Sequence, residues 1–537
     1  MARIWTNPEF VRHRRAELRP VRAVTIAVVV LLLCVLLGLA CWSYQASALE
    51  SIRRGAEAYP TEAWKHRLAD AENNFAPRTW MLFYRWLVAL QGLALTFWTL
   101  FSCAQSVSGE RDRKTWDFQR TTRLTSTEIL IGKLLGEPVL IYFAVLWAAP
   151  ATVIAGLGAG LSIGMVVSVL IFLAVVSMFL GLGGMWLSTL LESRTRGVGL
   201  IGALALYGFT LIIYEMHDGG LPGLAAMSPL TGFLSLLGHS PDADFRGALP
   251  VLFGHEVSWL LMNILLCGSF SAWFALMLIR NLKRDYPEIR PLSRWQAVGC
   301  AAFLNFLIYA LLRPAGPVDF LRSAATQRDW FTDAKTVALF AVGMNGLFLF
   351  LMGLATLTPQ ERLKVWKRDS SSGESKIFAD DGLSWPWLGI SAVVAYALMV
   401  WGLFAWNNTF PLEITTLQAS ALRLLLVLVF VTRDVLFLQW CMLTRLRAPI
   451  VKGVLFLCLY YGASIVLIAL AGVSSDNAGH WMMALLTPAQ VFDPQVTGMA
   501  FPAATYAGLF LQIGAVGAVI MAIHARLMRP IQSGAAA

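Results

Sequence analysis

Long apolar blocks separated by short polar segments dominate the pattern of this chain. The blocks at 23–42, 161–190 and 451–473 are each long enough to cross a hydrocarbon core of about 30 Å as a helix. The pattern as a whole predicts an all-α, polytopic membrane protein of about 12 transmembrane helices. We place these spans at 22–43, 80–104, 129–156, 162–190, 198–215, 256–280, 296–312, 335–357, 386–406, 419–443, 452–472 and 504–526.

The composition and the charge distribution agree with a membrane location. Hydrophobic residues make up 57% of the chain and charged residues 14%, whereas a soluble globular protein has about 25% charged residues. With the N-terminus inside, most of the 42 lysines and arginines fall in segments that face the cytoplasm, as the positive-inside rule expects. We therefore expect both termini on the cytoplasmic side of a plasma (inner) membrane. The net charge of +10 then needs no nucleic-acid partner.

Arginines precede the first apolar block, a pattern shared by signal peptides and retained membrane helices. A signal peptide would be cleaved after 46–48. The block is longer than the roughly 7–15 apolar residues of such a peptide, so we expect a retained helix. Basic residues beside an apolar stripe suit the membrane surface, and we expect an interfacial helix from Asn7 onward.

An internal repeat is expected to divide the chain into two six-span halves, 1–290 and 291–537. A Glu-Arg pair that begins at Glu110 follows the second span, and another that begins at Glu361 follows the eighth. An even number of spans per half makes the repeats parallel, with a symmetry axis along the membrane normal. The predicted architecture is two pseudo-symmetric six-helix bundles, the second divergent in sequence.

The external stretch 219–256 contains an apolar piece, 224–237, that is shorter than a span. A re-entrant or interfacial helix suits this length. We expect a second copy of this feature at 481–501.

The polar segment after the second span carries the most specific motif. It reads ERDRKTWDFQRTTRLTSTEILIGKLL from Glu110 to Leu135 and resembles, without a gap, the signature segment of ABC-2-type transporter permeases. Lys114 stands where the family pattern has glycine, Gln119 where it has leucine and Arg123 where it has proline. The resemblance implies that this segment contacts an ATPase subunit. The expected coupling residues are Ser108, Glu110, Arg111, Thr115, Trp116, Asp117, Glu128, Gly132 and Lys133, with Glu361, Arg362 and Trp366 in the second half.

A short helix is predicted over 108–120, with Ser108 as its N-cap. Glu110 and Lys114 are four residues apart on this helix and are expected to pair. Trp116 is a large apolar side chain in a polar segment. It is expected either to dock into a groove of a partner or to lie at the lipid interface, and the resemblance favours docking.

Ionisable residues within the predicted spans are candidates for function. Arg423, Arg433 and Asp434 lie in one span and are expected to form either a polar substrate path or latch, or a structural ion pair. In the structural alternative, Arg423 reaches toward the outer surface. Glu137 is expected to pair with Lys133, four residues before it.

The chain shows no P-loop, so we do not expect it to hydrolyse ATP itself. Its Gly132-Lys133 pair is followed by Leu134 instead of serine or threonine, and Thr127 stands where a P-loop has glycine. Neither the seven cysteines nor the seven histidines show metal-ligand spacing. We therefore expect no catalytic site, metal or cofactor in this chain, with ATP and Mg²⁺ bound by separate ATPase chains, two in number.

The resemblance implies the permease subunit of an ATP-binding-cassette exporter, with a lipid, drug or hydrophobic peptide as cargo. One alternative is an ion-gradient-driven secondary transporter built from parallel repeats, for which Asp434 and Glu137 are the candidate coupling carboxylates. Another alternative is a membrane scaffold that recruits an ATPase without transporting a substrate.

Overall fold

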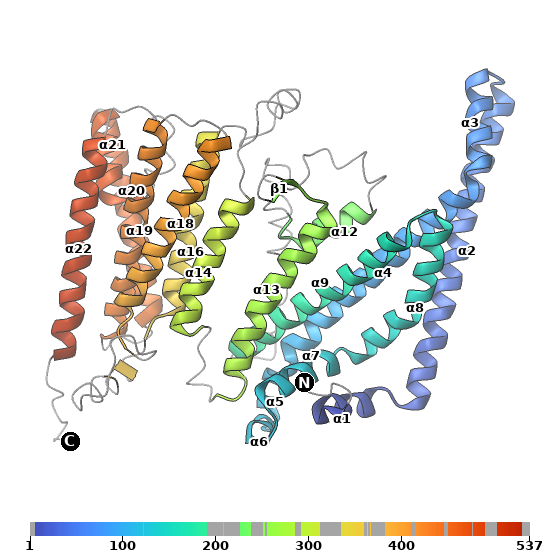
Figure 1. Ribbon diagram of the computed structural model, residues 1–537, viewed down its shortest axis with the longest axis horizontal. Coiled ribbons are helices and arrows are strands. Elements are labelled where there is room, and N and C mark those ends of the chain that lie inside the picture. The colour runs from blue at the N-terminus through green and yellow to red at the C-terminus, as the bar shows by residue number, and fades with distance from the viewer. Residues whose placement is uncertain are drawn as a thin grey trace. The chain divides into compact units, whose positions relative to one another are not determined.

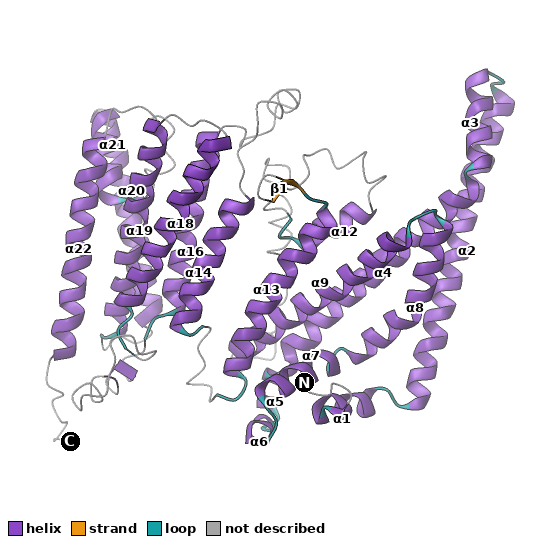
Figure 2. Ribbon diagram, viewed as in Figure 1, coloured by secondary structure: helices purple, strands orange, loops and turns teal. Residues whose placement is uncertain are grey.

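The computed structural model is almost entirely helical where it describes the chain (Figures 1 and 2). The described residues are 6–121, 123–190, 208, 226–237, 251–252, 255–284, 292–311, 334–358, 362–363, 366, 382–409, 414–444, 449–474, 476–488 and 502–528. Within them, eight helices are long and apolar enough to cross a membrane. The predicted all-α, polytopic class is confirmed. The count of 12 spans stays a prediction, because several of the expected spans lie partly or wholly outside these residues.

The chain forms two compact units. Unit 1 comprises Met1–His217, Pro222–Pro250 and Glu256–Ile289, and unit 2 comprises Asp218–Leu221, Val251–His255 and Arg290–Ala537. Each unit is described by itself below.

Unit 1 is built on a central pair of long helices, α4 and α9, which pack along most of their length. The helices α13 and α8 cover this pair, and the short α12 packs on α13. Its helices are α1 (Pro8–Glu17), α2 (Pro20–Ala58), α3 (Glu62–Asn73), α4 (Phe75–Ser106), α5 (Ser108–Asp112), α6 (Trp116–Thr121), α7 (Ser126–Gly136), α8 (Val139–Gly158), α9 (Ile163–Leu190), α12 (Pro229–Leu237) and α13 (Trp259–Asn281). Between α12 and α13 in the chain lie the two-residue strands β1 (Val251–Leu252) and β2 (His255–Glu256), of which β1 is assigned to unit 2.

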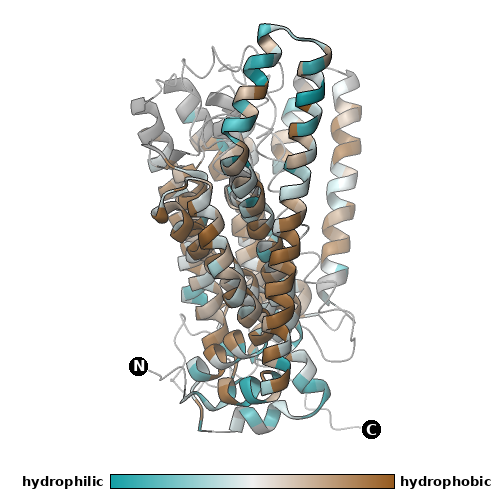
Figure 3. Cartoon of the chain, turned by 90° about the vertical axis from the view of Figure 1, so that its right-hand side faces the viewer, coloured by the Kyte–Doolittle hydropathy of each residue, from teal (hydrophilic) through white to brown (hydrophobic). Residues whose placement is uncertain are grey.

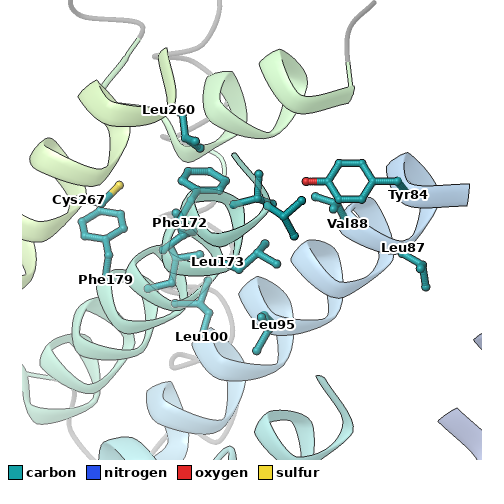
Figure 4. Packing of buried hydrophobic residues seen from close by; sticks show 14 of the residues in the cluster. Tyr84, Leu87, Val88, Leu95, Leu100, Phe172, Leu173, Phe179, Leu260 and Cys267 are labelled. Carbon is teal, nitrogen blue, oxygen red and sulfur yellow. The ribbon is translucent and has the colours of Figure 1, made fainter. Parts of the chain in front are cut away.

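The core of unit 1 lies where these helices meet (Figure 4). Phe172 is fully buried on α9 and belongs to the same buried cluster as Leu95 and Leu100 of α4. A glycine allows the close approach of the two helices, because a Cβ atom on Gly184 would lie 2.8 Å from the backbone oxygen of Leu100. On α12, Thr231 accepts a hydrogen bond of 3.0 Å from the side-chain amide of Asn263. The short apolar piece expected at 224–237 therefore ends in a helix that is packed against the bundle.

The helix α2 extends far beyond the predicted span at 22–43. Its 39 residues measure about 58 Å at a rise of about 1.5 Å per residue, nearly twice the hydrocarbon thickness of about 30 Å. The C-terminal part of α2 pairs with α3 as a polar helical hairpin. Arg53 Nη2 on α2 lies 3.1 Å from Glu72 Oε1 on α3. Figure 3 shows the apolar middle of α2 between polar ends. Between the predicted spans at 22–43 and 80–104, the structure has the rest of α2, all of α3 and the start of α4.

Unit 2 is centred on α19, which packs against α16, α18, α20 and α22. Its core includes Leu388, Val435 and Leu436. Gly353 lets α16 approach α19 closely, because a Cβ atom there would lie 2.6 Å from a methyl group of Val435. The helices are α14 (Arg294–Leu311), α16 (Ala334–Ala355), α18 (Trp385–Thr409), α19 (Ile414–Met442), α20 (Pro449–Ser474), α21 (Asp476–Leu486) and α22 (Pro502–Met528).

Candidate functional site

The signature segment folds onto the N-terminal helix through a set of charged and polar side chains, which are largely buried except for Arg12. We call this set the charge cluster; it consists of Glu9, Arg12, His13, Glu110, Gln119 and Lys133. These residues come from α1, α5, α6 and α7, which gather at one end of unit 1 (Figure 1).

Lys133 is the centre of the charge cluster. Its side chain has an exposed fraction of 0%, and its Nζ lies 2.6 Å from Glu110 Oε2 and 3.8 Å from Glu9 Oε1. The other oxygen of Glu110 accepts hydrogen bonds from Arg12 Nη2 at 2.8 Å and from Gln119 Nε2 at 2.7 Å. Because burying an unpaired charge is costly, this network explains how a lysine is tolerated inside the protein.

Trp116 closes one side of the charge cluster. Its exposed fraction is 5%, and Lys133 Nζ lies 5.6 Å from the centroid of its ring, within cation–π range. Arg111 lies over the same ring at 6.0 Å, and its Nη1 donates a hydrogen bond of 3.1 Å to the carbonyl of Thr189 on α9. The tryptophan therefore packs inside unit 1, and the expectation that it docks into a partner or lies at the lipid interface is corrected.

The predicted single helix over 108–120 is two short helices, α5 and α6. The N-cap position of α5 is Val107, and Ser108 donates its N–H to Ser188 Oγ at 2.9 Å instead of capping the helix. The chain turns between the helices at Lys114, which has φ 57°. Glu110 pairs with Lys133 and Arg12, so the expected pair with Lys114 does not form.

Lys114 occupies a backbone conformation that glycine adopts most easily. It is the only non-glycine residue with positive φ among the described residues, and it stands at the glycine of the family pattern. The departure from the pattern therefore strains this turn without abolishing it.

Replacing Lys114 by glycine is expected to stabilise the protein by about 1 kcal/mol. The left-handed conformation costs a lysine about 1–2 kcal/mol, and the greater freedom of glycine in the unfolded chain offsets part of the gain. Thermal unfolding of the purified protein in mild detergent measures the change. Arg113→Gly is the matched control. Arg113, the residue before Lys114, has a φ of −79°, which any residue adopts easily, so glycine there should destabilise the protein.

Two glycines allow α1 to lie directly on α7. A Cβ atom on Gly132 would lie 2.6 Å from Glu9 Cβ, and one on Gly136 would lie 2.9 Å from His13 Cβ. Asn7 caps α1 by accepting from the N–H groups of Glu9 and Phe10, and its Nδ2 donates to the carbonyl of Glu128 at 2.7 Å. The predicted helix after Asn7 thus exists, but its polar face is occupied by the charge cluster.

Glu137 lies at the edge of the charge cluster and does not form the expected pair with Lys133. Its Oε1 is 3.8 Å from His13 Nε2, while Lys133 turns to Glu110. Burial raises the pKa of Glu137 above its ordinary value, although His13 and Lys133 act in the opposite direction. For Glu9, burial also acts to raise the pKa, but the hydrogen bond from His13 and the charges of Lys133 and Arg12 outweigh it, and the pKa is lowered.

These opposite shifts predict opposite effects of two matched substitutions. At neutral pH, Glu9→Gln should lower the thermal stability, because the ionised form of Glu9 is favoured in the folded state. Glu137→Gln should raise it, because burial of the ionised carboxylate is costly.

The pH dependence separates the two effects. The gain from Glu137→Gln should fade as the pH falls through the raised pKa toward 4.5, the ordinary value. The loss of stability from Glu9→Gln should persist down to about pH 4.5, the ordinary pKa of a glutamate, and should fade only at lower pH. Melting curves of both variants over this range measure the effects, and a common pH dependence would contradict the assignment.

Comparison with protein families identifies this part of the chain. Residues 19–237 match the model of a family described as ABC-2 type transporter. These residues are an ABC-2 transporter membrane domain. The comparison with curated proteins and the comparison with solved structures gave no match. The chain is therefore a membrane component of an ABC-2 transporter, a class of permease that works with ABC ATPase subunits.

In the ABC-2 domain, the expected coupling residues separate into a buried and an accessible group. Glu110, Trp116, Gly132 and Lys133 are buried, and Glu128 reaches back to Thr125 in a capping box that begins α7. The accessible group lies around the turn between α5 and α6. Its members are Thr115 and Asp117, while Ser108 and Arg111 are half-buried. Thr115 and Asp117 form one surface with their exposed neighbours Asp112, Arg113 and Lys114, which we call the α5–α6 ridge.

Sequence reasoning missed the contribution of α1 to this site. Glu9, Arg12 and His13 have the i, i+3 and i, i+4 spacing of one helical face, which marks a polar surface but does not name its partner. Gln119 was noted only as a departure from the ABC-2 pattern. In the structure, it donates to Glu110 at 2.7 Å and to Glu9 at 3.3 Å.

The second-half candidates are only partly visible. Glu361 lies outside the described residues, and Arg362 and Trp366 are half-buried. Arg423 has an exposed fraction of 4%, so it does not reach a surface as the structural alternative expected.

Arg433 and Asp434 form a buried ion pair of 2.6 Å on α19. Arg433 also donates to Gln512 Oε1 at 2.7 Å, and Tyr461 donates its hydroxyl to Asp434. Tyr460 and Gln512 in turn donate to carbonyls of α21. These contacts join α19 to α20, α21 and α22, and they favour the structural interpretation of the pair over a substrate path.

Proposed function

We propose that the chain is the permease subunit of an ABC-2 exporter and that its ATPase partners bind at the α5–α6 ridge. The observation that supports this proposal most directly is the division of the signature segment. Its buried residues hold the segment in a fixed shape, whereas the ridge exposes charges of both signs. Charged, accessible side chains on a fixed support suit a contact with a second protein.

The ridge is mechanically connected to the membrane helices. Ser188 on α9 accepts the N–H groups of Val107 and Ser108, where α4 passes into α5. Lys133 also donates to the carbonyl of Ser106 at 3.5 Å, which links α7 to the end of α4. A displacement of the ridge would therefore move α4, α7 and α9 together, as alternating access or gated export requires.

The ATPase partners would bind and hydrolyse the ATP that drives transport. In this proposal two nucleotide-binding chains hold ATP and Mg²⁺, and their closure presses on the ridge and on a weaker counterpart around Arg362. The proposed topology places both termini and the ridge on the cytoplasmic side of the cell membrane. The apolar composition favours a lipid, a drug or a hydrophobic peptide as cargo, and outward transport rests on analogy with the family.

The contacts of Asp434 favour this proposal over a gradient-driven transporter. A coupling carboxylate must exchange a proton or Na⁺ during transport. Asp434 instead pairs with Arg433 and accepts from Tyr461.

The test is co-purification of an ATPase with the tagged full chain from native membranes. Asp117→Arg changes an exposed charge on the ridge, whereas Glu62→Arg makes the same change on α3, far from the ridge in sequence. We expect the ATPase to be lost, with its stimulated ATP hydrolysis, only in Asp117→Arg. Equal co-purification with both variants would refute the ridge as the docking surface. Absence of any ATPase with the unaltered chain would count against the ABC proposal itself.

Stimulation by substrate separates transport from scaffolding. A permease should increase ATP hydrolysis by its partner when cargo is added to the reconstituted complex. A scaffold should retain the ATPase but leave its rate unchanged by any apolar compound.

A further inference from the structure

A cavity of about 840 Å³ lies beside the charge cluster in unit 1. Phe10 and Arg14 of α1 and Leu18 at its C-terminal cap line one end, and mostly apolar side chains of α4, α7, α8 and α9 line the rest. The charge cluster occupies one face of α1, and Phe10, Arg14 and Leu18 follow one another at i, i+4 and i+8 on the face toward the cavity. The helix therefore separates an ionic contact from an apolar space.

The length of the cavity corresponds to one leaflet of a membrane. Its lining on α8 runs from Val139 to Ala149, which spans about 15 Å at about 1.5 Å per residue. One leaflet of a hydrocarbon core of about 30 Å has the same thickness. The cavity thus begins beside α1 and is about as long as the acyl-chain layer of one leaflet is thick.

The deep part of the cavity offers an apolar wall. Its two hydroxyl groups are already engaged, because Tyr142 donates to the carbonyl of Leu134 at 3.3 Å and Ser177 bonds to Thr99 at 3.0 Å. Polar ligands would find few free partners there. An acyl chain requires none.

Arg14 is the only charged residue among those that line the cavity. Its guanidinium lies 6.0 Å from the ring centroid of Phe10, and it has no ion-pair partner among the described residues. The neighbouring Arg12 pairs with Glu9 and Glu110, and Arg22 pairs with Glu17. The charge at the mouth of the cavity therefore lacks the compensation that Arg12 and Arg22 have, and a phosphate group would supply it.

We propose that this cavity holds an acyl chain of one anionic phospholipid, with the lipid phosphate at Arg14. The lipid is a resident ligand that supports α1 from the side opposite the charge cluster. This proposal does not depend on the ATPase partners, and only the assignment of the lipid to the inner leaflet rests on the proposed topology.

Native mass spectrometry of the detergent-purified full chain tests the proposal. Dioleoyl phosphatidylglycerol and dioleoyl phosphatidylcholine are titrated separately, because they share acyl chains and differ in net charge. We expect the anionic lipid to bind first, as a single adduct. Arg14→Ala should weaken this adduct about fivefold, since one arginine near a membrane surface contributes about this factor to anionic lipid binding.

Three further variants make the result decisive. Arg15→Ala removes an exposed arginine from the same helix outside the cavity lining and should leave the adduct unchanged. Ala149→Trp fills the deep end of the cavity and should weaken both lipids, whereas Arg14→Lys should retain the preference for the anionic lipid. Equal binding of the two lipids, or equal loss in Arg14→Ala and Arg15→Ala, would overturn the proposal. The measurement uses the chain alone, so its failure would leave the proposed function unaffected.

Discussion

Replacing Lys133 by methionine is expected to lower the free energy of unfolding by about 3–5 kcal/mol, although methionine has a similar volume and a high helix propensity. The substitution removes the only cation that pairs with Glu110 Oε2 in the described network and leaves the carboxylate buried. Removal of one partner of a buried ion pair costs more than the pair itself contributes, because the remaining charge is poorly solvated. Thermal or urea unfolding of the purified protein in mild detergent measures the loss.

The exposed pair between Lys65 and Glu62 provides a matched control. Its nitrogen–oxygen distance is 2.9 Å, close to the 2.6 Å of the buried pair, but its side chains are 63% and 80% exposed. Lys65→Met should therefore change the stability by no more than about 1 kcal/mol. Adding Glu110→Gln to Lys133→Met should restore part of the loss, because it removes the unpaired charge. Similar losses in the two lysine variants would show that burial does not determine the effect.

The sequence allowed the membrane class of the fold to be predicted, because a helix that crosses lipid must satisfy its own backbone and present apolar side chains over about 20 residues. The same criterion could not find the hairpin of α2 and α3. Outside the membrane, a polar helix has no apolar block, and residues 44–79 contain helix-forming residues in a pattern that also suits a loop. The contact between Gly55 and Trp64, which brings the two helices together, becomes evident only in the folded chain.

The candidate site was predicted in part. The motif named Glu110 and Lys133, and these two residues do meet, although 23 positions separate them. What the motif could not supply was the direction of the side chains. Trp116 was expected to point outward because its neighbours in the sequence are polar, but it belongs to a buried cluster with residues of α4, α7, α9 and α13. Those contacts depend on the tertiary fold.

The role of α1 was the largest omission, and its physical cause is clear. Glu9 and Glu110 are 101 positions apart in the chain, so no local pattern connects them. Seen alone, the first helix has an amphipathic pattern that the membrane surface satisfies equally well. Only the close approach at Gly132 and Gly136 shows that the polar face is buried in protein.

Asp434→Asn is expected to be the most destabilising single substitution in unit 2, with a loss of about 3–5 kcal/mol. The side chains of Arg433 and Asp434 are 12% and 8% exposed, so their charges depend on each other. An asparagine would leave the guanidinium with Gln512, Tyr460 and the rings around it, none of which carries a charge. Arginine remains protonated at any accessible pH and cannot relieve the cost by neutralisation.

Arg433→Met should cost less than Asp434→Asn, although it removes more hydrogen bonds. The carboxyl group that remains can take up a proton and become neutral, and Tyr461 still donates to it. The double variant should lie close to the original stability, because a buried pair can often be replaced by uncharged side chains with little loss. Thermal unfolding in mild detergent gives all three values. If Arg433→Met is instead the worse of the two single variants, the arginine contributes chiefly through its contacts with α20 and α22 and not through its charge.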